Sequence, residues 1–264
     1  MTRGFGKAPA MRRMAFGLVA AASLALVLSG CPTDSNPGGS GLGDTPTLSG
    51  RMYEEVMIFG FTLLPPSLNM AIRYDGYNGN HTVTSNLAGR TGTITDGQLS
   101  IQLGIPADNE LSAVSATGSV FDGWGWTGVT ANPADARFAN LTLNVGDDEV
   151  RRVFSSMSVT GMTVNASYST VHFVYVDRDV TIRGTGMELP PDEDDFFPFS
   201  TTTESFDLPL RRGWNALHIR LEGSGNPFAG GVNATMTLSV GEPNNIRWVF
   251  GDTGLDGELP NLPF

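Results

Sequence analysis

Two tryptophans separated by one residue are the side chains whose type and spacing best suit ligand binding. They lie in residues 121–126 (FDGWGW), where an extended backbone places Trp124 and Trp126 on one face. The neighbouring glycines leave both rings accessible, and aromatic faces bind sugars or protein partners through stacking and apolar burial. We therefore predict a candidate ligand-binding surface at Trp124 and Trp126. The alternative is that both rings belong to a hydrophobic core.

Clustered carboxylates offer a second chemistry, because Ca2+ takes several oxygen ligands. Asp192, Asp194 and Asp195 lie in one acidic loop, and Asp177 and Asp179 end the predicted strand before it. The alternative is a solvated loop that keeps an exposed sheet edge from pairing. We predict no resident metal or cofactor, with calcium at Asp192, Asp194 and Asp195 as the alternative.

A second calcium pattern is incomplete. Residues 251–258 (GDTGLDGE) match part of a D-x-[DN]-x-[DN]-G loop, but Gly254 stands where an oxygen ligand belongs. Pro263 occupies the place of the bidentate Glu. This segment is therefore predicted to be a C-terminal tail.

Motifs of the common hydrolases do not occur in the sequence. It has no G-x-S-x-G elbow and no H-E-x-x-H pair. His81 lies in a polar, turn-rich segment, and His172 and His218 lie within predicted strands, where packed histidines are expected. Carboxylates are so numerous that no glycosidase pair can be singled out. No catalytic residue is predicted, and a binding or structural role is favoured over catalysis.

The N-terminus is typical of an export signal. Arg3, Lys7, Arg12 and Arg13 precede 14 uncharged, mostly apolar residues, 14–27, with no acidic residue among them. A bilayer-spanning helix needs about 20 such residues, so this run predicts a signal peptide.

The apolar run ends in Leu28-Ser29-Gly30-Cys31. This tetrapeptide resembles the lipobox of bacterial lipoproteins. The resemblance implies cleavage before Cys31, acylation of Cys31 with fatty acids such as palmitate, and a membrane anchor in the cell envelope, with the outer membrane favoured. Several acyl chains anchor stably, because each buried CH2 contributes about 0.8 kcal/mol. The alternatives are an ordinary signal peptide that ends near a buried cysteine, and twin-arginine export through Arg12 and Arg13.

Charge and cysteine content exclude several classes of protein. The full chain has a formal charge of −11, and removing the leader leaves 12 basic against 27 acidic residues, or −15. Nucleic-acid binding is not expected, since it depends on neutralising phosphates with Lys and Arg. Cys31 is the single cysteine, so the exported chain has no disulfide of its own and no cysteine nucleophile.

The exported part is rich in strand signals. Alternating or β-branched runs occur at 99–103, 141–145, 170–176, 214–221 and 232–240, with turn pairs such as Asn78-Gly79 and Asp96-Gly97 between them. The candidates for helix are short, Ser67 to Tyr74 and Asp147 to Phe154. We predict an all-β fold of one or two antiparallel β-sandwich domains, Ig-like or transthyretin-like.

The predicted domains follow from these patterns. Residues 1–30 are the signal peptide, 31–46 the lipidated cysteine with a flexible Gly/Ser/Pro-rich linker, 47–132 one sandwich and 133–264 a second. The boundary is placed in the polar stretch 130–137. One continuous sandwich is the alternative.

The C-terminal part carries a strand 179–184 (DVTIRG), then 208–215 (LPLRRGWN), then 247–250 (RWVF). This order is similar to that of uncharacterised β-rich bacterial surface lipoproteins. The resemblance implies an envelope protein and brings no activity with it. In physical terms, Gly213 turns the chain, Trp214 anchors the next strand in the core and Asn215 satisfies the turn.

Taken together, the sequence predicts a lipid-anchored envelope protein with a structural or binding role. Its expected partners are the membrane, through the anchor, and an envelope protein or glycan. The alternative is a carbohydrate-binding or carbohydrate-active extracytoplasmic protein.

Overall fold

Strands account for most of the described chain. The computed structural model describes residues 41–63, 66–114, 126–160, 162–186, 188–189, 199–226 and 231–250. Within these residues the only helical segment is a short 3-10 turn, η1 (Asp108–Glu110). The predicted all-β, antiparallel-rich fold of sandwich type is therefore confirmed.

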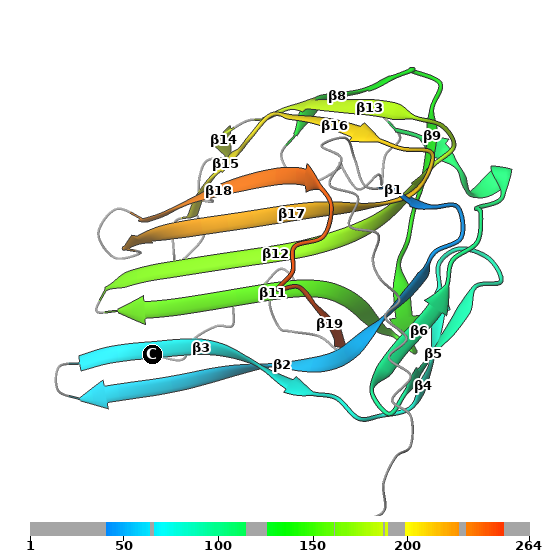
Figure 1. The fold of residues 1–264 in the computed structure, drawn as a ribbon. Coiled ribbons are helices and arrows are strands. Elements are labelled where there is room, and N and C mark those ends of the chain that lie inside the picture. The colour runs from blue at the N-terminus through cyan, green and yellow to red at the C-terminus, as the bar shows by residue number, and fades with distance from the viewer. Residues whose placement is uncertain are drawn as a thin grey trace, which may run out of the picture. The chain divides into compact units, whose positions relative to one another are not determined.

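The described strands form two sheets (Figure 1). The larger sheet runs in the order β10 (Leu143–Val145), β4 (His81–Ser85), β5 (Thr91–Thr95), β6 (Gln98–Gln102), β2 (Thr47–Leu63), β19 (Arg247–Phe250), β11 (Asp148–Thr160), β12 (Thr163–Val176), β17 (Gly213–Asn226), β18 (Gly231–Val240), β15 (Phe199–Thr203) and β14 (Glu188–Leu189). Four further strands pair beside this path: β1 (Gly41–Gly43) with β17, β3 (Pro66–Gly76) with β2, β7 (Ser112–Ala113) with β9, and β9 (Arg137–Asn140) with β12. The smaller sheet has the order β16 (Phe206–Leu210), β13 (Val180–Thr185) and β8 (Thr127–Asn132).

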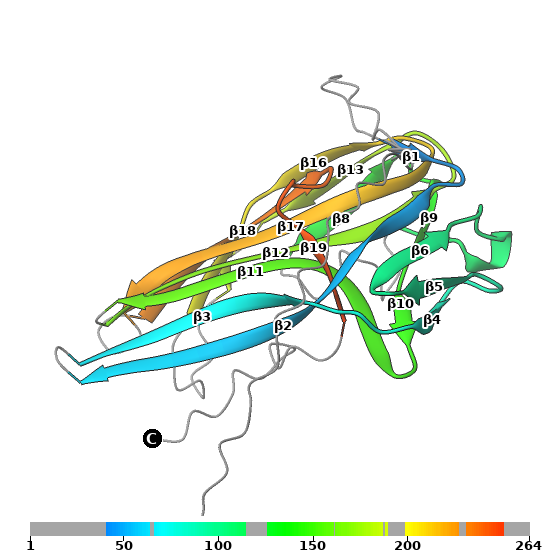
Figure 2. The same ribbon diagram turned by 60° about the horizontal axis from the view of Figure 1, so that its bottom comes forward.

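Strands β12 and β17 are each buried on both faces at one end. This is the end of the pair at Val176↔Gly213. Phe173 and Tyr175 contribute to one hydrophobic cluster, whereas Val174 and Val176 contribute to the other. Successive side chains of a strand point to opposite faces, so one strand can serve two cores. Figures 1 and 2 show β8, β13 and β16 over one face of these strands, and β4, β5 and β6 beside the same ends, where their side chains share a cluster with Phe173 and Tyr175. The β-branched run at 170–176, predicted to be a strand, is thus a central strand of the larger sheet.

The turn before β17 has the structure that the residues Gly213, Trp214 and Asn215 predict. Gly213 has φ +98°, and a Cβ there would lie 2.8 Å from the carbonyl of Gly43. The Trp214 side chain is fully buried, and its Nε1 donates a hydrogen bond of 3.0 Å to the carbonyl of Gly104. Asn215 is also fully buried, with its hydrogen bonds directed to the backbone of the turn.

Both predicted helices are strands in the structure. Residues 67–74 lie in β3, which pairs with β2 from Leu63↔Pro66 to Tyr53↔Gly76. Residues 148–154 belong to β11, which pairs with β10, β12 and β19. The helix predictions were wrong because this extensive cross-strand pairing outweighs the weak local propensity on which they rested.

Strand pairs connect the chain on both sides of the predicted boundary at residues 130–137. The described residues between 41 and 250 belong to one compact unit, and the stretch 130–137 runs from the end of β8 to the start of β9 inside it. Pairs such as β2–β19 and β4–β10 join strands from both sides of that stretch. The predicted linker also contains β1, which pairs with β17. A Cβ at Gly41 would lie only 2.9 Å from the Cβ of Arg211, so glycine suits this position.

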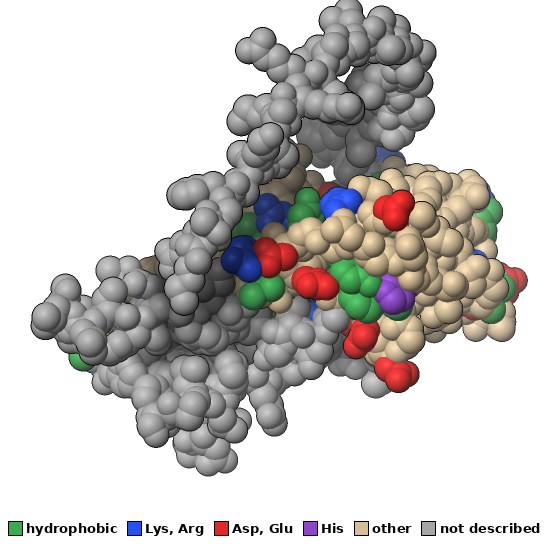
Figure 3. Space-filling model, turned by 90° about the horizontal axis from the view of Figure 1, so that it is seen from below, with side chains coloured by type: hydrophobic (Ala, Val, Ile, Leu, Met, Phe, Trp, Pro, Cys, Tyr) green, Lys and Arg blue, Asp and Glu red, His purple; other side chains and the backbone are tan. Residues whose placement is uncertain are grey.

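The described surface mixes both signs of charge. Figure 3 shows arginine side chains interspersed with acidic and hydrophobic ones on the face seen from below. Several of the described arginines pair with carboxylates, for example Arg183 with Asp207 at 2.8 Å and Arg211 with Asp179 at 3.0 Å. Such exposed pairs stabilise a fold by about 0–1 kcal/mol each.

Candidate functional site

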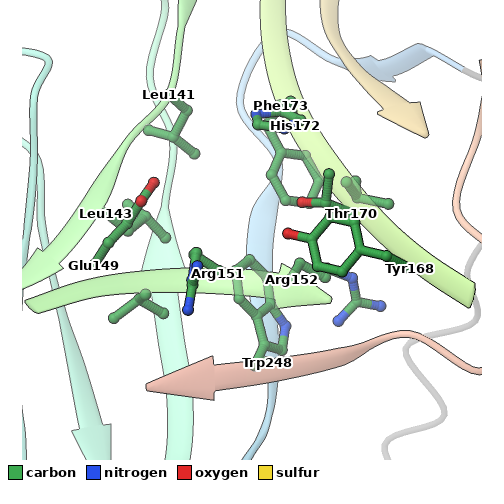
Figure 4. A pocket seen from close by; sticks show the side chains of 12 residues that line it. Leu141, Leu143, Glu149, Arg151, Arg152, Tyr168, Thr170, His172, Phe173 and Trp248 are labelled. Carbon is green, nitrogen blue, oxygen red and sulfur yellow. The ribbon is translucent and has the colours of Figure 1, made fainter. Parts of the chain in front are cut away.

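A cavity forms where β11 and β12 separate. The two strands pair from Thr160↔Thr163 as far as Val153↔Thr170. Beyond that point β11 pairs with β10 and β12 pairs with β9. The divergence leaves a cavity of about 180 Å³, which we call the inter-strand cavity. Figure 4 shows Leu141 and Leu143 on the side of this cavity away from β12.

The inter-strand cavity has polar and apolar linings that follow the alternation of the strands. Thr170 lies opposite Val153, so Tyr168, Thr170 and His172 of β12 share a face of the sheet with Glu149 and Arg151 of β11. The apolar lining comes from core residues: Leu143, Val150, Val171, Phe173 and Trp248.

Three side chains with ionisable groups, Glu149, Arg151 and His172, line the inter-strand cavity. Burial lowers the pKa of His172, so its imidazole is neutral near pH 7 and offers one donor and one acceptor. Glu149 adds a carboxylate and Arg151 a guanidinium (Figure 4). Ligand pockets for drug-sized molecules measure about 300–1,000 Å³. At about 180 Å³ this cavity falls below that range.

A larger hollow shares two lining residues, Arg152 and Trp248, with the inter-strand cavity. It measures about 390 Å³ and combines guanidinium groups, aromatic rings and side-chain amides. We call it the arginine–aromatic groove, and its lining consists of Ser49, Gly50, Arg51, Tyr53, Arg152, Phe154, Asn244, Asn245, Ile246, Arg247 and Trp248.

Tyr74 of β3 fixes one border of the arginine–aromatic groove. Its ring stacks on Phe154 with centroids 6.4 Å apart, and its hydroxyl accepts a hydrogen bond from the Ser155 N–H. The same hydroxyl donates to Glu55 at 3.2 Å. Burial raises the pKa of Tyr74 to about 12, so the hydroxyl keeps its proton. The β2–β3 hairpin is therefore tied to β11 beside the groove.

A third hollow, the polar groove, crosses β11 near Ser156, β12 near Ala166 and β17 near Gly223. Ser156 lies opposite Ser167, and Ser158 lies opposite Asn165. Ser224 of β17 donates a hydrogen bond of 2.7 Å to Asn165 Oδ1. The polar groove measures about 520 Å³, and its described lining is dominated by hydroxyl and amide groups. It offers hydrogen bonds without an aromatic face.

Trp126 does not contribute an exposed aromatic face. Its side chain is 8% exposed and belongs to the cluster beneath the smaller sheet. The indole packs edge-on against Phe206 at 5.4 Å, and Nε1 donates to the Glu204 carbonyl at 3.0 Å. The core alternative therefore applies to Trp126. Trp124 lies outside the described residues.

The calcium candidates Asp192, Asp194 and Asp195 also lie outside the described residues, as does the tail 251–264. Their proposed neighbours are engaged elsewhere. Desolvation alone raises the pKa of Asp177, but the backbone hydrogen bond from Arg137 and the Arg178 guanidinium outweigh it and lower the pKa. The described residues contain no group of three His, Cys, Asp or Glu side chains that could hold a metal.

The other histidines occupy different surroundings. His81 lies at the start of β4, where its ring stacks on Tyr77 at 5.8 Å and on Phe250 at 5.5 Å. His218 of β17 is half-buried, and desolvation together with the charge of Arg220 lowers its pKa. The structure does not bring these two histidines into the inter-strand cavity with His172.

No local sequence pattern indicates the arginine–aromatic groove. Tyr53, Tyr74 and Arg247 are brought together by the β2–β3 hairpin and by the parallel pairing of β19 with β2. Contacts between residues so distant in the chain leave no local pattern. The one available signal was Arg247 beside Trp248 at the start of a strand, which is also what an ordinary core strand shows.

Comparison with known proteins places the chain in no family: no family model matches it, and neither the curated proteins nor the solved structures contain a significant match. Among the residues that the structure describes, none forms a helix long and apolar enough to cross a membrane. Cys31 and the preceding apolar run lie outside those residues.

Proposed function

We propose that the chain is a lipid-anchored protein of the bacterial cell envelope whose β-sheet body binds a ligand or partner. The observation that carries the proposal is the order of basic residues, apolar run and Leu28-Ser29-Gly30-Cys31 at the N-terminus. Cleavage before Cys31 and acylation of its thiol and amino group would attach the chain to a membrane, with the outer membrane favoured. The segment between Cys31 and β1 would then act as a short spacer.

The cavities support binding more than catalysis. Glycoside hydrolysis ordinarily uses two carboxylic acids on either side of the scissile bond. Among the described residues, the inter-strand cavity is lined by one carboxylate, Glu149, and the arginine–aromatic groove by none. Guanidinium groups, rings and amides instead hold a ligand through charge, stacking and hydrogen bonds.

Carbohydrate binding is the second candidate, and the composition of the arginine–aromatic groove favours it. Tyr53 and Phe154 supply apolar ring surface, and Asn244 and Asn245 supply exposed amides. Sugars present both an apolar C–H face and hydroxyl groups, so this mixture of side chains matches them.

The lipid anchor is tested by metabolic labelling with palmitate in the native host. We expect label in the wild-type chain, because Cys31 provides the thiol and, after cleavage, the amino group that are acylated. Cys31→Ser should carry no label. Ser29→Ala is the matched control, since it keeps a small residue beside the cleavage site and should be labelled like the wild type. An unlabelled wild-type chain, or equal label in Cys31→Ser, would contradict the proposal.

A further inference from the structure

The guanidinium of Arg247 in the arginine–aromatic groove packs against two aromatic rings instead of forming an ion pair with a described carboxylate. Its guanidinium lies 5.2 Å from the ring centre of Tyr53 and 4.7 Å from that of Tyr74. Two aromatic neighbours restrict a long side chain, while the N–H groups at the edge of the guanidinium plane stay available for acceptors. Among the described residues, no carboxylate forms an ion pair with Arg247.

A second guanidinium in the groove is also held by neutral groups. Arg51 donates to the carbonyl of Asp96 at 3.1 Å and to Oδ1 of Asn78. Neither acceptor carries a charge, so the charge of Arg51 is not compensated by a carboxylate among the described residues. Arg152 differs, because its Nε binds Glu242 at 2.6 Å while its guanidinium stacks over Trp248 at 5.1 Å.

Arg51 and Arg247 lack a carboxylate partner among the described residues although the chain is acidic. The sequence contains 27 acidic against 16 basic residues, so carboxylates available for pairing are in excess. Elsewhere in the described chain, Arg90, Arg137 and Arg178 each have a carboxylate partner. A concave surface with uncompensated positive charge concentrates anions locally, even on a protein of negative net charge.

The other side chains of the groove limit the kind of anion. The volume of about 390 Å³ lies within the ordinary range of ligand pockets, about 300–1,000 Å³. The rings of Tyr53 and Phe154 offer apolar contact that a small inorganic anion does not use. The amides of Asn244 and Asn245 are exposed and can bind hydroxyl groups.

We propose that the arginine–aromatic groove binds an acidic saccharide, with a sugar carboxylate on Arg247 and Arg51 and the apolar face of the ring on Tyr53 or Phe154. This inference rests on the proposed binding function and names its ligand class. A guanidinium can bind a carboxylate through two parallel hydrogen bonds, and a charge-assisted bond of this kind is about twice as strong as a neutral one. A neutral sugar of the same size lacks that interaction.

Isothermal titration calorimetry of the purified full-length chain tests the ligand. The probes are a galacturonic acid trisaccharide, a neutral galactose trisaccharide and inorganic phosphate. We expect saturable binding of the acidic trisaccharide, at least about tenfold weaker binding of the neutral one, and weakening by added NaCl. Absence of acidic-trisaccharide binding, or equal affinity for the neutral trisaccharide or for phosphate, would overturn the inference. The palmitate-labelling result is independent of these outcomes, so the two failures are distinguishable.

Variants locate the binding in the groove. Arg247→Gln removes the charge and should weaken acidic-trisaccharide binding at least about tenfold. Arg183→Gln is the matched control, because Arg183 is 58% exposed, pairs with Asp207 on the smaller sheet and should leave the affinity unchanged. Asn245→Ala, at an exposed turn position, gives a second probe if Arg247→Gln unfolds, and should weaken binding several-fold. Unchanged affinity in folded Arg247→Gln, or in Asn245→Ala if Arg247→Gln unfolds, would overturn the assignment to this groove.

Discussion

Asn215 supplies the hydrogen bonds that the backbone lacks at the turn between β16 and β17. Its Oδ1 accepts from the Arg211 N–H at 3.1 Å. Its Nδ2 donates to the Arg211 carbonyl at 2.7 Å and to the Gly213 carbonyl at 2.9 Å. Because the side chain is fully buried, water cannot replace these bonds. A single asparagine therefore holds the chain in the bend that leads Trp214 into the core.

Replacing this side chain tests that role. Asn215→Ala removes the partner of the Arg211 N–H and of the Arg211 and Gly213 carbonyls, and an unsatisfied buried group such as the Gly213 carbonyl costs about 1–3 kcal/mol. We expect the free energy of unfolding, measured by urea denaturation, to fall by about 3 kcal/mol. Asn215→Asp keeps the acceptor and loses the donor, but it also buries a charge. It should therefore lower the free energy of unfolding at least as much as Asn215→Ala. A loss below about 0.5 kcal/mol for Asn215→Ala would be typical of an ordinary surface position and would contradict this account.

Among the elements, the smaller sheet depends on Trp126 for its packing on the larger one. The indole lies just before β8, contacts Phe206 of β16 edge-on and bonds to the Glu204 carbonyl. Its neighbours in the cluster, Val180 and Ile182, come from β13. The Trp126 indole thus precedes β8, contacts β16 and shares a hydrophobic cluster with residues of β13.

Trp126→Ala separates a core role from a ligand-binding role. Truncating a buried tryptophan costs about 3–5 kcal/mol, so we expect a marked fall in the thermal midpoint. At a temperature where the variant is folded, binding of the acidic trisaccharide should be unchanged, because Trp126 does not line the arginine–aromatic groove. Trp126→Phe, which keeps much of the apolar volume, should lose less stability. A variant that keeps its stability and loses binding would restore the aromatic-platform interpretation.

Prediction from sequence succeeded where the signal is local to one element. The strands at 170–176 and 232–240 show a β-branched run and a strict alternation, and the roles of Gly213, Trp214 and Asn215 follow from their residue types. It failed where pairing between distant segments decides the structure. Residues 67–74 form a strand because β2 pairs with them, and Arg247 becomes part of a groove because β19 lies beside β2.

For the whole folded unit, the shared central strands join the two hydrophobic clusters. Strand β17 contributes Trp214 and Ala216 to one cluster and Leu217 and Ile219 to the other. The strand cannot leave one core without exposing the side chains of the second. Two independent sandwiches, by contrast, would bury separate cores on separate strands.

Cooperative unfolding of the body follows from this sharing. We expect one urea transition with the same midpoint by tryptophan fluorescence and by far-ultraviolet circular dichroism, the behaviour of a two-state domain. Ala216→Gly and Leu217→Ala, which alter opposite faces of β17, should each shift both probes together, since either core supports the same strands. Leu217→Ala should have the larger effect, about 2–5 kcal/mol, because it removes more buried volume. Separate midpoints, or a variant that moves one probe alone, would indicate that the two clusters unfold independently despite their common strands.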